Sequence, residues 1–441
     1  GQGDDGAGGA PALPGDLAVM NPQRLTGYYD QAKETMAPAA RRRYQETWLR
    51  ALVALAWERA PGVRRRMEAA RLGPKDLGSV ESLSRLPVIK KNAMPDLQKA
   101  DPPFGGFCTV PMKQIRRIFV SPGPIYEPMG PEVGGWHFEA GLYAGGFRPG
   151  DIVLNTFAYH LTPAAHMVDE ALNLVGCTAI PTGVGNTDTQ VGIAKAVGAT
   201  GFVGTPSFLM TVLKRAEEMG AGRLPFQVAQ VGAEALPESL RRTFEDQYGI
   251  MTRQGFGTAD LGLVAYECVE KSGMHLVEEA IVQVCDPQSG EPLPNGQIGE
   301  LVATVNHHTY PMIRFGTGDL TVIDDARCPC GRTSARMLGW RGRADEVTKV
   351  RGMFIHPRQV DEAAAKVKGV SRCQVVVTRR EHQDVMTFRV ELAEGVQAGA
   401  VTPALEGTIR DVMKLRGAVE VVPNGSIPEG AKKISDERKW A

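Results

Sequence analysis

Short apolar runs alternate with helical stretches between residues 151 and 206, and this alternation constrains the fold more than any other feature of the sequence. Runs with the composition of strands are DIVLNT (151–156), CTAIPTG (177–183) and TGFVGTP (200–206). Helical periodicity covers residues 163–175 and 189–199. A strand–helix–strand order at this spacing predicts βαβ units around a largely parallel sheet. Because ligands of such sheets bind beyond the carboxyl ends of the strands, we expect a functional site on the loops that follow them.

The rhythm changes after about residue 340, which indicates a second domain. The elements predicted there are a helix near 357–367, strands at 374–378 and 385–392, a helix near 402–415 and a strand at 418–422. This order resembles the βαββαβ arrangement of a small ferredoxin-like α+β domain. Before the βαβ region, residues 22–72 are expected to form two helices with a break at Pro61–Gly62.

We therefore predict an α/β fold in three segments. Residues 1–20, which are rich in glycine, are expected to form a flexible tail. Residues 21–343 are expected to form a large domain of mixed sheets with helices on both faces. Residues 344–441 are expected to form the small ferredoxin-like domain, which we expect to be mobile.

Composition excludes several classes of protein. The 441 residues carry 50 Lys and Arg against 50 Asp and Glu, so bulk charge does not favour a nucleic acid or an anionic membrane as a partner. Hydrophobic residues make up 43%, enough for a large core. Seven cysteines do not resemble a secreted disulfide framework, and the apolar stretch at 48–57 is too short to span a membrane. A small-molecule enzyme of the cytoplasm is expected.

Three segments near the end of the large domain carry the most specific signal. They are YPMIRFGTGDLTVI (310–323), CPCGRT (328–333) and GRADEVTKVRGMFIHPRQVDEA (342–363). In this order they resemble the adenylate-forming ligases, and within them the phenylacetate–CoA ligase family, from about residue 40 to residue 441. The resemblance implies activation of an aryl or arylacetic carboxylate by ATP to an acyl-adenylate, rotation of the small domain, and transfer of the acyl group to coenzyme A. It also allows a homodimer.

The resemblance implies roles for individual residues. Asp319 would accept both ribose hydroxyls, since one carboxylate can accept two such bonds. Arg343 would contact the ribose or a phosphate, and Asp345 would be the hinge between the domains. In GAEA, Gly232, Ala233 and Glu234 would line the adenine pocket. In QGFGTAD, Phe256, Gly257 and Thr258 would support the α-phosphate, and Asp260 would bind Mg²⁺ where the family has Glu.

Three cysteines and one histidine form a second group of candidate functional residues. Cys268 and His275 lie seven positions apart, and Cys328 and Cys330 follow in a tight CPC turn. Three cysteines and one histidine supply four ligands, which suffice for a closed tetrahedral Zn²⁺ site, and a closed site is structural rather than catalytic. The alternative is four unmetallated side chains that pack near one another.

The phosphate loop departs from the family pattern, a Ser-Ser-Gly-Thr-Thr-Gly-x-Pro string. This chain reads SPGPIYEP (121–128), in which Ser121 and Gly123 match. Two prolines each remove a backbone donor, and Glu127 adds a negative charge. Such a loop is expected to hold a triphosphate less well.

The C-terminal lysine and the acyl pocket are harder to place. The string PEGAKKISDERKW (428–440) offers Lys432 and Lys433 as substitutes for the family's catalytic lysine, and true loss of that lysine is the alternative. Phe157, Tyr159 and His160 follow a predicted strand and could line an aryl pocket, although such residues are more often core or rim residues.

Three functions remain open from the sequence. The first is a ligase that uses ATP, Mg²⁺ and coenzyme A on an aryl carboxylate, with a structural Zn²⁺. The second is an adenylating enzyme with another acceptor, such as a hydroxyl group on a deazaflavin. The third is a nucleotide- or acyl-CoA-binding relative without triphosphate chemistry, which the altered loop favours.

Overall fold

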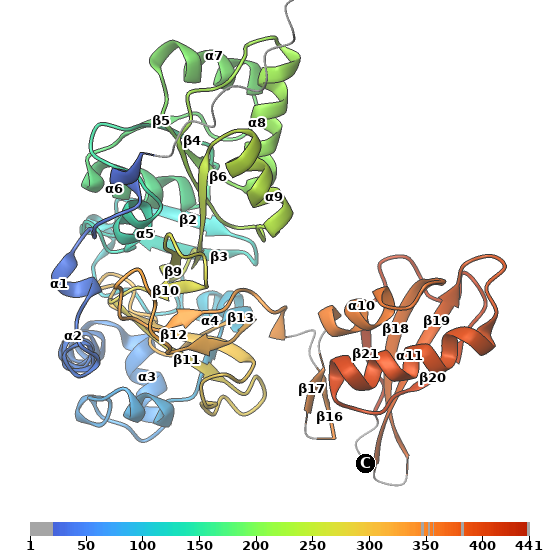
Figure 1. Cartoon of the computed structure of the whole chain (residues 1–441). Helices are drawn as coiled ribbons and strands as arrows, with labels where there is room; N and C mark the ends of the chain where they lie inside the picture. The colour runs from blue at the N-terminus through green and yellow to red at the C-terminus, as the bar shows by residue number, and fades with distance from the viewer. Residues whose placement is uncertain (1–20, 345–347, 352, 356, 381–382, 439–441) are drawn as a thin grey trace, which may run out of the picture.

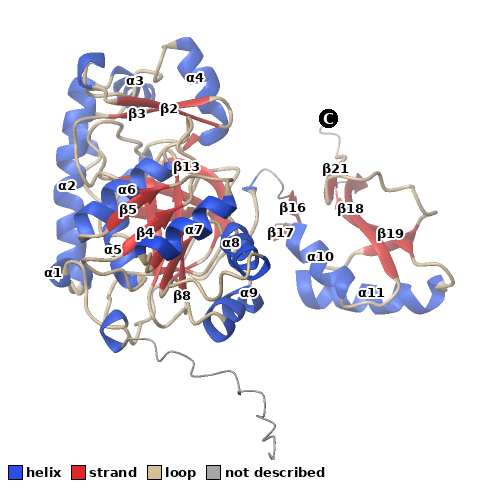
Figure 2. Cartoon of the chain, turned by 90° about the horizontal axis from the view of Figure 1, so that it is seen from above, coloured by secondary structure: helices blue, strands red, loops and turns tan. Residues whose placement is uncertain are grey.

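The computed structural model describes residues 21–344, 348–351, 353–355, 357–380 and 383–438. The predicted tail at 1–20 and the predicted hinge Asp345 lie outside these residues. The described chain forms a large α/β part followed by a small α+β part, which stands to one side of it (Figure 1). Figure 2 shows the same separation from above.

A nine-stranded sheet forms the centre of the large part, and its strand order is β14-β15-β10-β9-β8-β7-β6-β4-β5. Five of these strands are parallel, as the βαβ rhythm predicts: β4 (Ile152–Asn155), β5 (Thr178–Pro181), β6 (Gly201–Gly204), β7 (Val228–Val231) and β8 (Met251–Thr258). The helices between them are α6 (Ala164–Val175), α7 (Thr187–Val197), α8 (Pro206–Glu218) and α9 (Glu238–Arg242).

Helices cover both faces of the parallel strands, as the alternation of side chains requires. One face, with Val153, Val203 and Val228, packs against α6 and α5 (Phe138–Ala144). The opposite face, with Leu154 and Phe202, packs against α7 and α8. This confirms the predicted α/β class.

Strand β8 changes partner along its length. Residues 251–254 pair in parallel with β7, and residues 255–258 pair antiparallel with β9 (Gly262–Glu267). The sheet continues antiparallel through β10 (Met274–Leu276), β15 (Arg336–Met337) and β14 (Ile323–Asp324). The second half of β8 therefore extends beyond the carboxyl edge of the parallel strands.

The remaining elements of the large part complete its core. Helices α2 (Pro38–Arg59) and α3 (Pro61–Ala69) meet at the predicted Pro61–Gly62 break. They pack on a four-stranded sheet in the order β1-β13-β12-β11, with bounds Ile89–Lys90, Phe315–Thr321, Gly299–Val305 and Ala280–Cys285. Helices α1 (Gln31–Glu34) and α4 (Met94–Ala100), and the hairpin of β2 (Arg117–Ser121) and β3 (Ile125–Met129), complete this part.

The small part has an α+β arrangement, as predicted. Its main sheet has the order β20-β19-β18-β21, with bounds Ala418–Val421, Gln383–Leu392, Val370–Arg380 and Ile434–Asp436. Helices α10 (Pro357–Ala365) and α11 (Ala398–Met413) cover one face of it, and β16 (Thr348–Val350) pairs with β17 (Met353–Ile355) in a separate hairpin. Across the described residues, no helix combines the length and apolarity needed to cross a membrane.

A buried ion pair fixes the point at which β8 changes partner. Arg241 on α9 and Glu267 on β9 form two hydrogen bonds of 2.8 Å, and both side chains are 3% exposed. Glu267 also accepts the backbone N–H of Gln254 at 3.0 Å and its side-chain amide at 2.8 Å. This carboxylate therefore ties α9, β8 and β9 together.

Loss of one partner of this pair should be more costly than loss of both charges. We expect Arg241→Met to lower the free energy of unfolding by about 3–5 kcal/mol, because Glu267 is left charged and buried. Adding Glu267→Gln should recover about 2 kcal/mol, since an amide still accepts from Gln254. Arg242→Met, at a side chain 73% exposed, is the control and should change little. Denaturant unfolding measures all three, and equal losses in the single and double variants would contradict this account.

Candidate active site at the carboxyl edge of the parallel strands

A cavity of about 290 Å³ opens where the sequence predicts a site, beyond the parallel strands. Its lining is apolar over α5 and α6 and on the sheet face that they cover. The apolar lining residues are Phe138, Leu142, Phe157, Pro163, Ala164, Met167, Val168, Val203, Val231 and Leu263. The polar end of the cavity is lined by Lys91, Ser121, Gly232, Ala233, Gly257 and Thr258, and Gln230 is a polar side chain within the apolar part. The site thus joins an apolar compartment to a polar one.

Of the residues predicted to bind nucleotide, five line this cavity, and the first of them, Ser121, ends β2. Gly232 and Ala233 follow β7, and Gly257 and Thr258 end β8. Gly257 has no room for a side chain, because a Cβ there would lie 2.5 Å from the carbonyl oxygen of Gly262. The backbone of β8 can therefore approach a ligand closely at this position.

One residue predicted to line the adenine pocket and one predicted to support the α-phosphate lie elsewhere. Glu234 is exposed and accepts a hydrogen bond from the Ser207 hydroxyl at 2.9 Å. Phe256 packs against the large hydrophobic core, because alternation along β8 turns its side chain away from the face on which Gly257 meets the cavity. Neither is among the lining residues of the cavity.

An ion pair that sequence reasoning missed lies at the polar end of the cavity. The Lys91 ammonium is 2.9 Å from Oδ2 of Asp260, whose side chain is fully buried. Lys91 also lines a second cavity of about 170 Å³, together with Gly318 and Arg343. One cation therefore connects the main cavity to the region around Arg343. A Lys-Lys pair at 90–91 is the only sequence signal, and most such pairs are solvated.

The phosphate loop forms the tight turn between β2 and β3, in which Ser121 pairs with Ile125. Of the three turn residues, only Gly123 retains a backbone N–H, since its neighbours are prolines. The Ser121 hydroxyl donates to Glu127. The expectation of a poor triphosphate loop thus has a structural basis: the Ser121 hydroxyl is already engaged by the Glu127 carboxyl group.

Glu127 is 3% exposed, and its Oε2 atom has no hydrogen-bond partner among the described residues. Burial, together with the nearby charge of Asp260, raises the pKa of the Glu127 carboxyl to about 8. Glu127 is therefore protonated in the folded protein at neutral pH.

Asp319 and Arg343 lie side by side, as the predicted ribose site requires. Their backbones form an antiparallel bridge, and Nη1 of Arg343 is 3.1 Å from Oδ1 of Asp319. Trp340 donates to the same oxygen at 3.0 Å. Gly318 has φ +76°, and a Cβ there would lie 2.5 Å from Nη2 of Arg343. Glycine at this position lets the guanidinium reach the carboxylate.

Of the three residues predicted to line an aryl pocket, only Phe157 contacts the cavity. The Tyr159 hydroxyl donates to Asp169 at 2.7 Å, and its ring packs edge-on against His166. His160 is exposed. The structure therefore holds Tyr159 by its own hydrogen bond outside the cavity, while helices α5 and α6 supply most of the apolar lining.

The predicted zinc ligands converge. One ligand atom from each of Cys268, His275, Cys328 and Cys330 lies within 4.8 Å of all the others. Cys268 Sγ is 3.7 Å from Cys328 Sγ, and Cys330 Sγ is 3.4 Å from Nε2 of His275. The Cys268 thiol and His275 hold the pKa of the Cys330 thiol well below its usual range. Nδ1 of His275 lies 3.2 Å from the Ser334 carbonyl oxygen, which turns Nε2 toward the sulfur atoms.

The two candidate lysines lie in the small part of the chain. Both side chains are exposed, and the Lys433 ammonium pairs with Asp361 at 2.8 Å. Neither is among the residues that line the two cavities described above.

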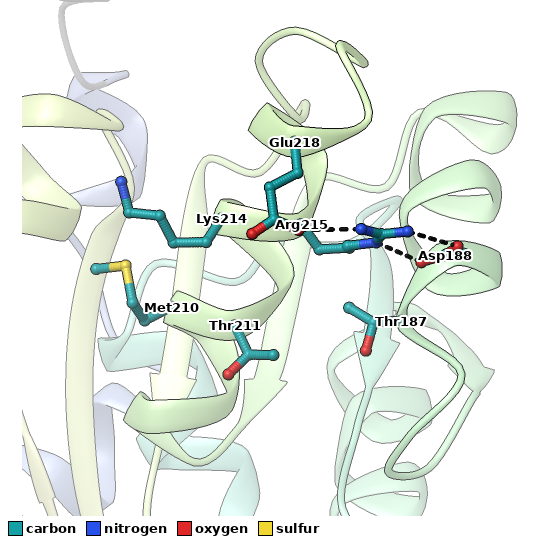
Figure 3. A pocket seen from close by; sticks show the side chains of 7 residues that line it. All are labelled: Thr187, Asp188, Met210, Thr211, Lys214, Arg215 and Glu218. Atoms are coloured by element: carbon teal, nitrogen blue, oxygen red, sulfur yellow. Dashed lines mark hydrogen bonds and ion pairs between the residues drawn. The ribbon is translucent and has the colours of Figure 1, made fainter.

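Another hollow, of about 420 Å³, lies on the surface between α7 and α8 (Figure 3). Arg215 dominates it and pairs with Asp188 at 2.6 Å and with Glu218 at 3.0 Å. These charges satisfy one another and are exposed, so the hollow offers no group poised for chemistry.

Comparison with known proteins identifies relatives along the chain. A model of the AMP-binding enzyme family matches residues 140–308, and a model of the AMP-binding enzyme C-terminal domain matches residues 352–438. The phenylacetate-coenzyme A ligase of Thermus thermophilus is 31% identical over 384 residues, which cover 83% of this chain and 84% of the relative. The enzyme of the same name from Aromatoleum evansii is 29% identical over 409 residues, covering 87% and 91%.

Solved structures with the same fold include 2-hydroxyisobutyryl-CoA ligase. Its open conformation, in complex with 2-HIB-AMP and CoA, matches with a TM-score of 0.84 at 26% identity and covers 96% of this chain and 97% of that one. The same ligase in its thioesterification state matches with a TM-score of 0.68 at 27% identity, covering 97% and 96%. The chain thus resembles the open conformation more closely.

The raised pKa of Glu127 predicts a pH dependence of stability. The folded protein keeps this proton up to about pH 8, whereas the unfolded chain releases it near pH 4.5. The contribution of Glu127 to the free energy of unfolding is therefore full below pH 4.5 and is lost as the pH rises toward 8. Relative to Glu127→Gln, the wild type should lose about 2–5 kcal/mol across this window.

Thermal unfolding in EDTA from pH 5 to pH 9 measures this difference. The melting temperature of Glu127→Gln should overtake that of the wild type as the pH rises. Melting curves that stay parallel over the whole range would show that Glu127 is charged throughout.

Proposed function

The chain belongs to the phenylacetate–CoA ligase family of AMP-binding enzymes, and we propose that its own reaction joins an aryl or arylacetic acid to coenzyme A. As an enzyme of this family it activates a carboxylate with ATP and transfers the acyl group to coenzyme A. One observation carries the proposal: the apolar cavity is connected through Lys91 to the Asp319–Arg343 pair. An acid in the cavity would therefore meet a nucleotide that extends toward that pair.

The lining of the cavity supports an aryl acid. Two phenylalanines, Phe138 and Phe157, and the side chains of Leu142, Met167 and Leu263 surround the apolar compartment. Flat, rigid rings bury a large apolar area at low cost in conformational entropy. Gly232, Ala233 and Thr258 mark the end at which the carboxylate would face the α-phosphate.

The first half-reaction is attack of a carboxylate oxygen on the α-phosphorus, with pyrophosphate as the leaving group. Charge develops on the phosphate oxygens, so a cation placed beside them lowers the barrier. Lys91 lies between the two cavities and supplies that charge in our proposal. Its present partner, Asp260, would then be released.

The carboxylates near Lys91 fit the Mg²⁺ that this reaction uses. Asp260 is buried, and the Glu127 carboxyl group, whose Oε2 atom has no hydrogen-bond partner among the described residues, would release its proton to bind the ion. Mg²⁺ prefers oxygen ligands of this kind. When bound, the ion would neutralise phosphate charge, and Asp260 would hold it once Lys91 contacts the phosphates.

Asp319 is proposed to bind the ribose. Both of its side-chain contacts use Oδ1, which leaves Oδ2 to accept a ribose hydroxyl. Arg343 and Trp340 keep the carboxylate oriented for this role. Lys432 is proposed as the catalytic lysine, because its exposed ammonium can approach the cavity when the small domain rotates, whereas Lys433 is paired with Asp361.

The direct test is acyl-CoA formation from ATP, Mg²⁺, coenzyme A and a panel of aryl acids, followed by mass spectrometry. We expect a thioester and AMP, and we expect Asp319→Asn to raise the KM for ATP at least tenfold, since one charge-assisted bond to the ribose is weakened. Asp325→Asn, which makes the same change at an exposed residue six positions later in the sequence, is the control and should behave as the wild type. Nucleotide binding without any thioester would instead favour a relative that has lost triphosphate chemistry.

We further propose that the four-residue cluster holds a structural Zn²⁺. Around a tetrahedral zinc, sulfur and nitrogen ligands lie about 3.4–3.8 Å apart, which fits the 3.7 Å and 3.4 Å separations found here. The hydrogen bond of His275 to a carbonyl is typical of zinc ligands. Tyr28 donates to the carbonyl of Cys330 at 3.0 Å, so the metal would also anchor the N-terminal segment.

Elemental analysis of protein purified without added metal should find about one zinc per chain. Cys328→Ser should remove most of the zinc. It should also lower the melting temperature, because the turn that contains Cys328 and Cys330 is then no longer held by the metal. Cys108→Ser, at a half-buried cysteine outside the cluster, should retain the metal. Metal-free wild-type protein with an unchanged melting temperature in chelator would support four unmetallated side chains instead.

A further inference from the structure

The apolar compartment of the cavity contains a polar side chain, that of Gln230. Gln230 lies on β7 and is 7% exposed. Its face of the sheet also carries Val203 and is covered by Leu142 and Met167, all of which line the same cavity. The amide oxygen is buried without a hydrogen-bond partner among the described residues.

The space around this amide is made by two glycines. A Cβ on Gly145, which follows α5, would lie 2.6 Å from Oε1 of Gln230. A Cβ on Gly255, in β8, would lie 3.1 Å from Nε2. Any side chain at position 145 would push the amide out of its present place. The amide group thus occupies a slot that the absence of two side chains provides.

A buried amide without partners is costly in the free protein. Leaving a buried polar group without a hydrogen-bond partner destabilises the folded protein. Gly255, beside Nε2, lines the cavity, whereas Gly145, beside the buried Oε1, does not. A ligand in the cavity therefore meets the Nε2 end of the amide, and a 180° rotation of the amide presents the oxygen to it instead. A site that contains such a group favours a substrate with a matching polar group and disfavours an analogue that lacks it.

The register of β7 sets where that polar group would lie. Gln230 and Gly232 are two residues apart and fall on the same side of the strand, about 7 Å from one another. Gly232 lies at the polar end of the cavity, where the carboxylate would react. The amide therefore faces a part of the acid that is one ring length away from the carboxylate.

We propose that Gln230 selects aryl acids that carry a hydroxyl group on the ring, on the side remote from the carboxylate. This inference rests on the proposed function and names its substrate class. A hydroxyl group can donate a hydrogen bond to the amide oxygen or accept one from the amide nitrogen. It therefore pairs with the Gln230 amide whichever of the two atoms faces the ligand. Bond formation in the complex then recovers the cost of the unpaired amide.

The test compares acids that differ in a single group. We measure kcat/KM for 4-hydroxyphenylacetate and 4-methylphenylacetate, which have similar size. A second pair is mandelate, whose hydroxyl lies beside the carboxylate, and phenylacetate, which has no hydroxyl. The wild type should prefer the 4-hydroxy over the 4-methyl acid at least tenfold. Gln230→Met should abolish or reverse this preference while leaving the mandelate-to-phenylacetate ratio unchanged.

Gln190→Met is the matched control variant. Gln190 is also a buried glutamine with an unpartnered amide oxygen, but it does not line the cavity. Both acids are compared on one preparation, so their ratio does not depend on how much of a variant is folded. We expect Gln190→Met to keep the wild-type ratio.

The outcomes separate this inference from the proposed function. If none of the acids tested yields a thioester, the proposed function is overturned. Thioester formation with a wild-type 4-hydroxy to 4-methyl ratio near one, or with a ratio that Gln230→Met does not change, would overturn the role of Gln230 alone. A ratio that Gln190→Met changes equally would also overturn it.

Discussion

The site depends on the change of partner within strand β8. Its first half lies parallel to β7, and its second half pairs antiparallel with β9 beyond the edge of the parallel sheet. That extension places Gly255, Gly257 and Thr258 opposite the ends of β6 and β7 and gives the cavity one of its walls. Glu267 holds the point of change by accepting from Gln254 and Arg241. The cavity therefore exists because one buried carboxylate holds two kinds of sheet together.

Charge is distributed locally in a chain that is neutral overall. The equal numbers of acidic and basic residues exclude attraction by bulk charge, yet ATP and coenzyme A are both strongly anionic. The structure resolves this by placing single cations, Lys91 and Arg343, in the cavities that adjoin each other. In the absence of nucleotide Lys91 is neutralised by Asp260, and Glu127 keeps its proton. Phosphates would thus replace an internal carboxylate as the partner of Lys91.

The sequence predicted those parts of the fold and the site that local patterns determine. The βαβ rhythm placed β4, α6, β5, α7 and β6 within a few residues, and the CPC turn with its distant partners predicted the convergence of three cysteines and one histidine. Lys91 was missed, since a lysine becomes a site residue only through its burial beside Asp260. Gln230 was missed because its neighbours in VAQV indicate no more than a buried strand. Tyr159 was misplaced, because its hydrogen bond to Asp169 is a tertiary contact without a sequence signal.

The central claim is that this cavity activates a carboxylate despite its altered phosphate loop. Exchange of labelled pyrophosphate into ATP, measured without coenzyme A, tests the first half-reaction alone. The account predicts exchange that requires an aryl acid and Mg²⁺ and falls at least a hundredfold in Lys91→Met, since a cation beside the transition-state phosphate is removed. Exchange that is absent with every acid, in a protein that still binds AMP, would contradict it.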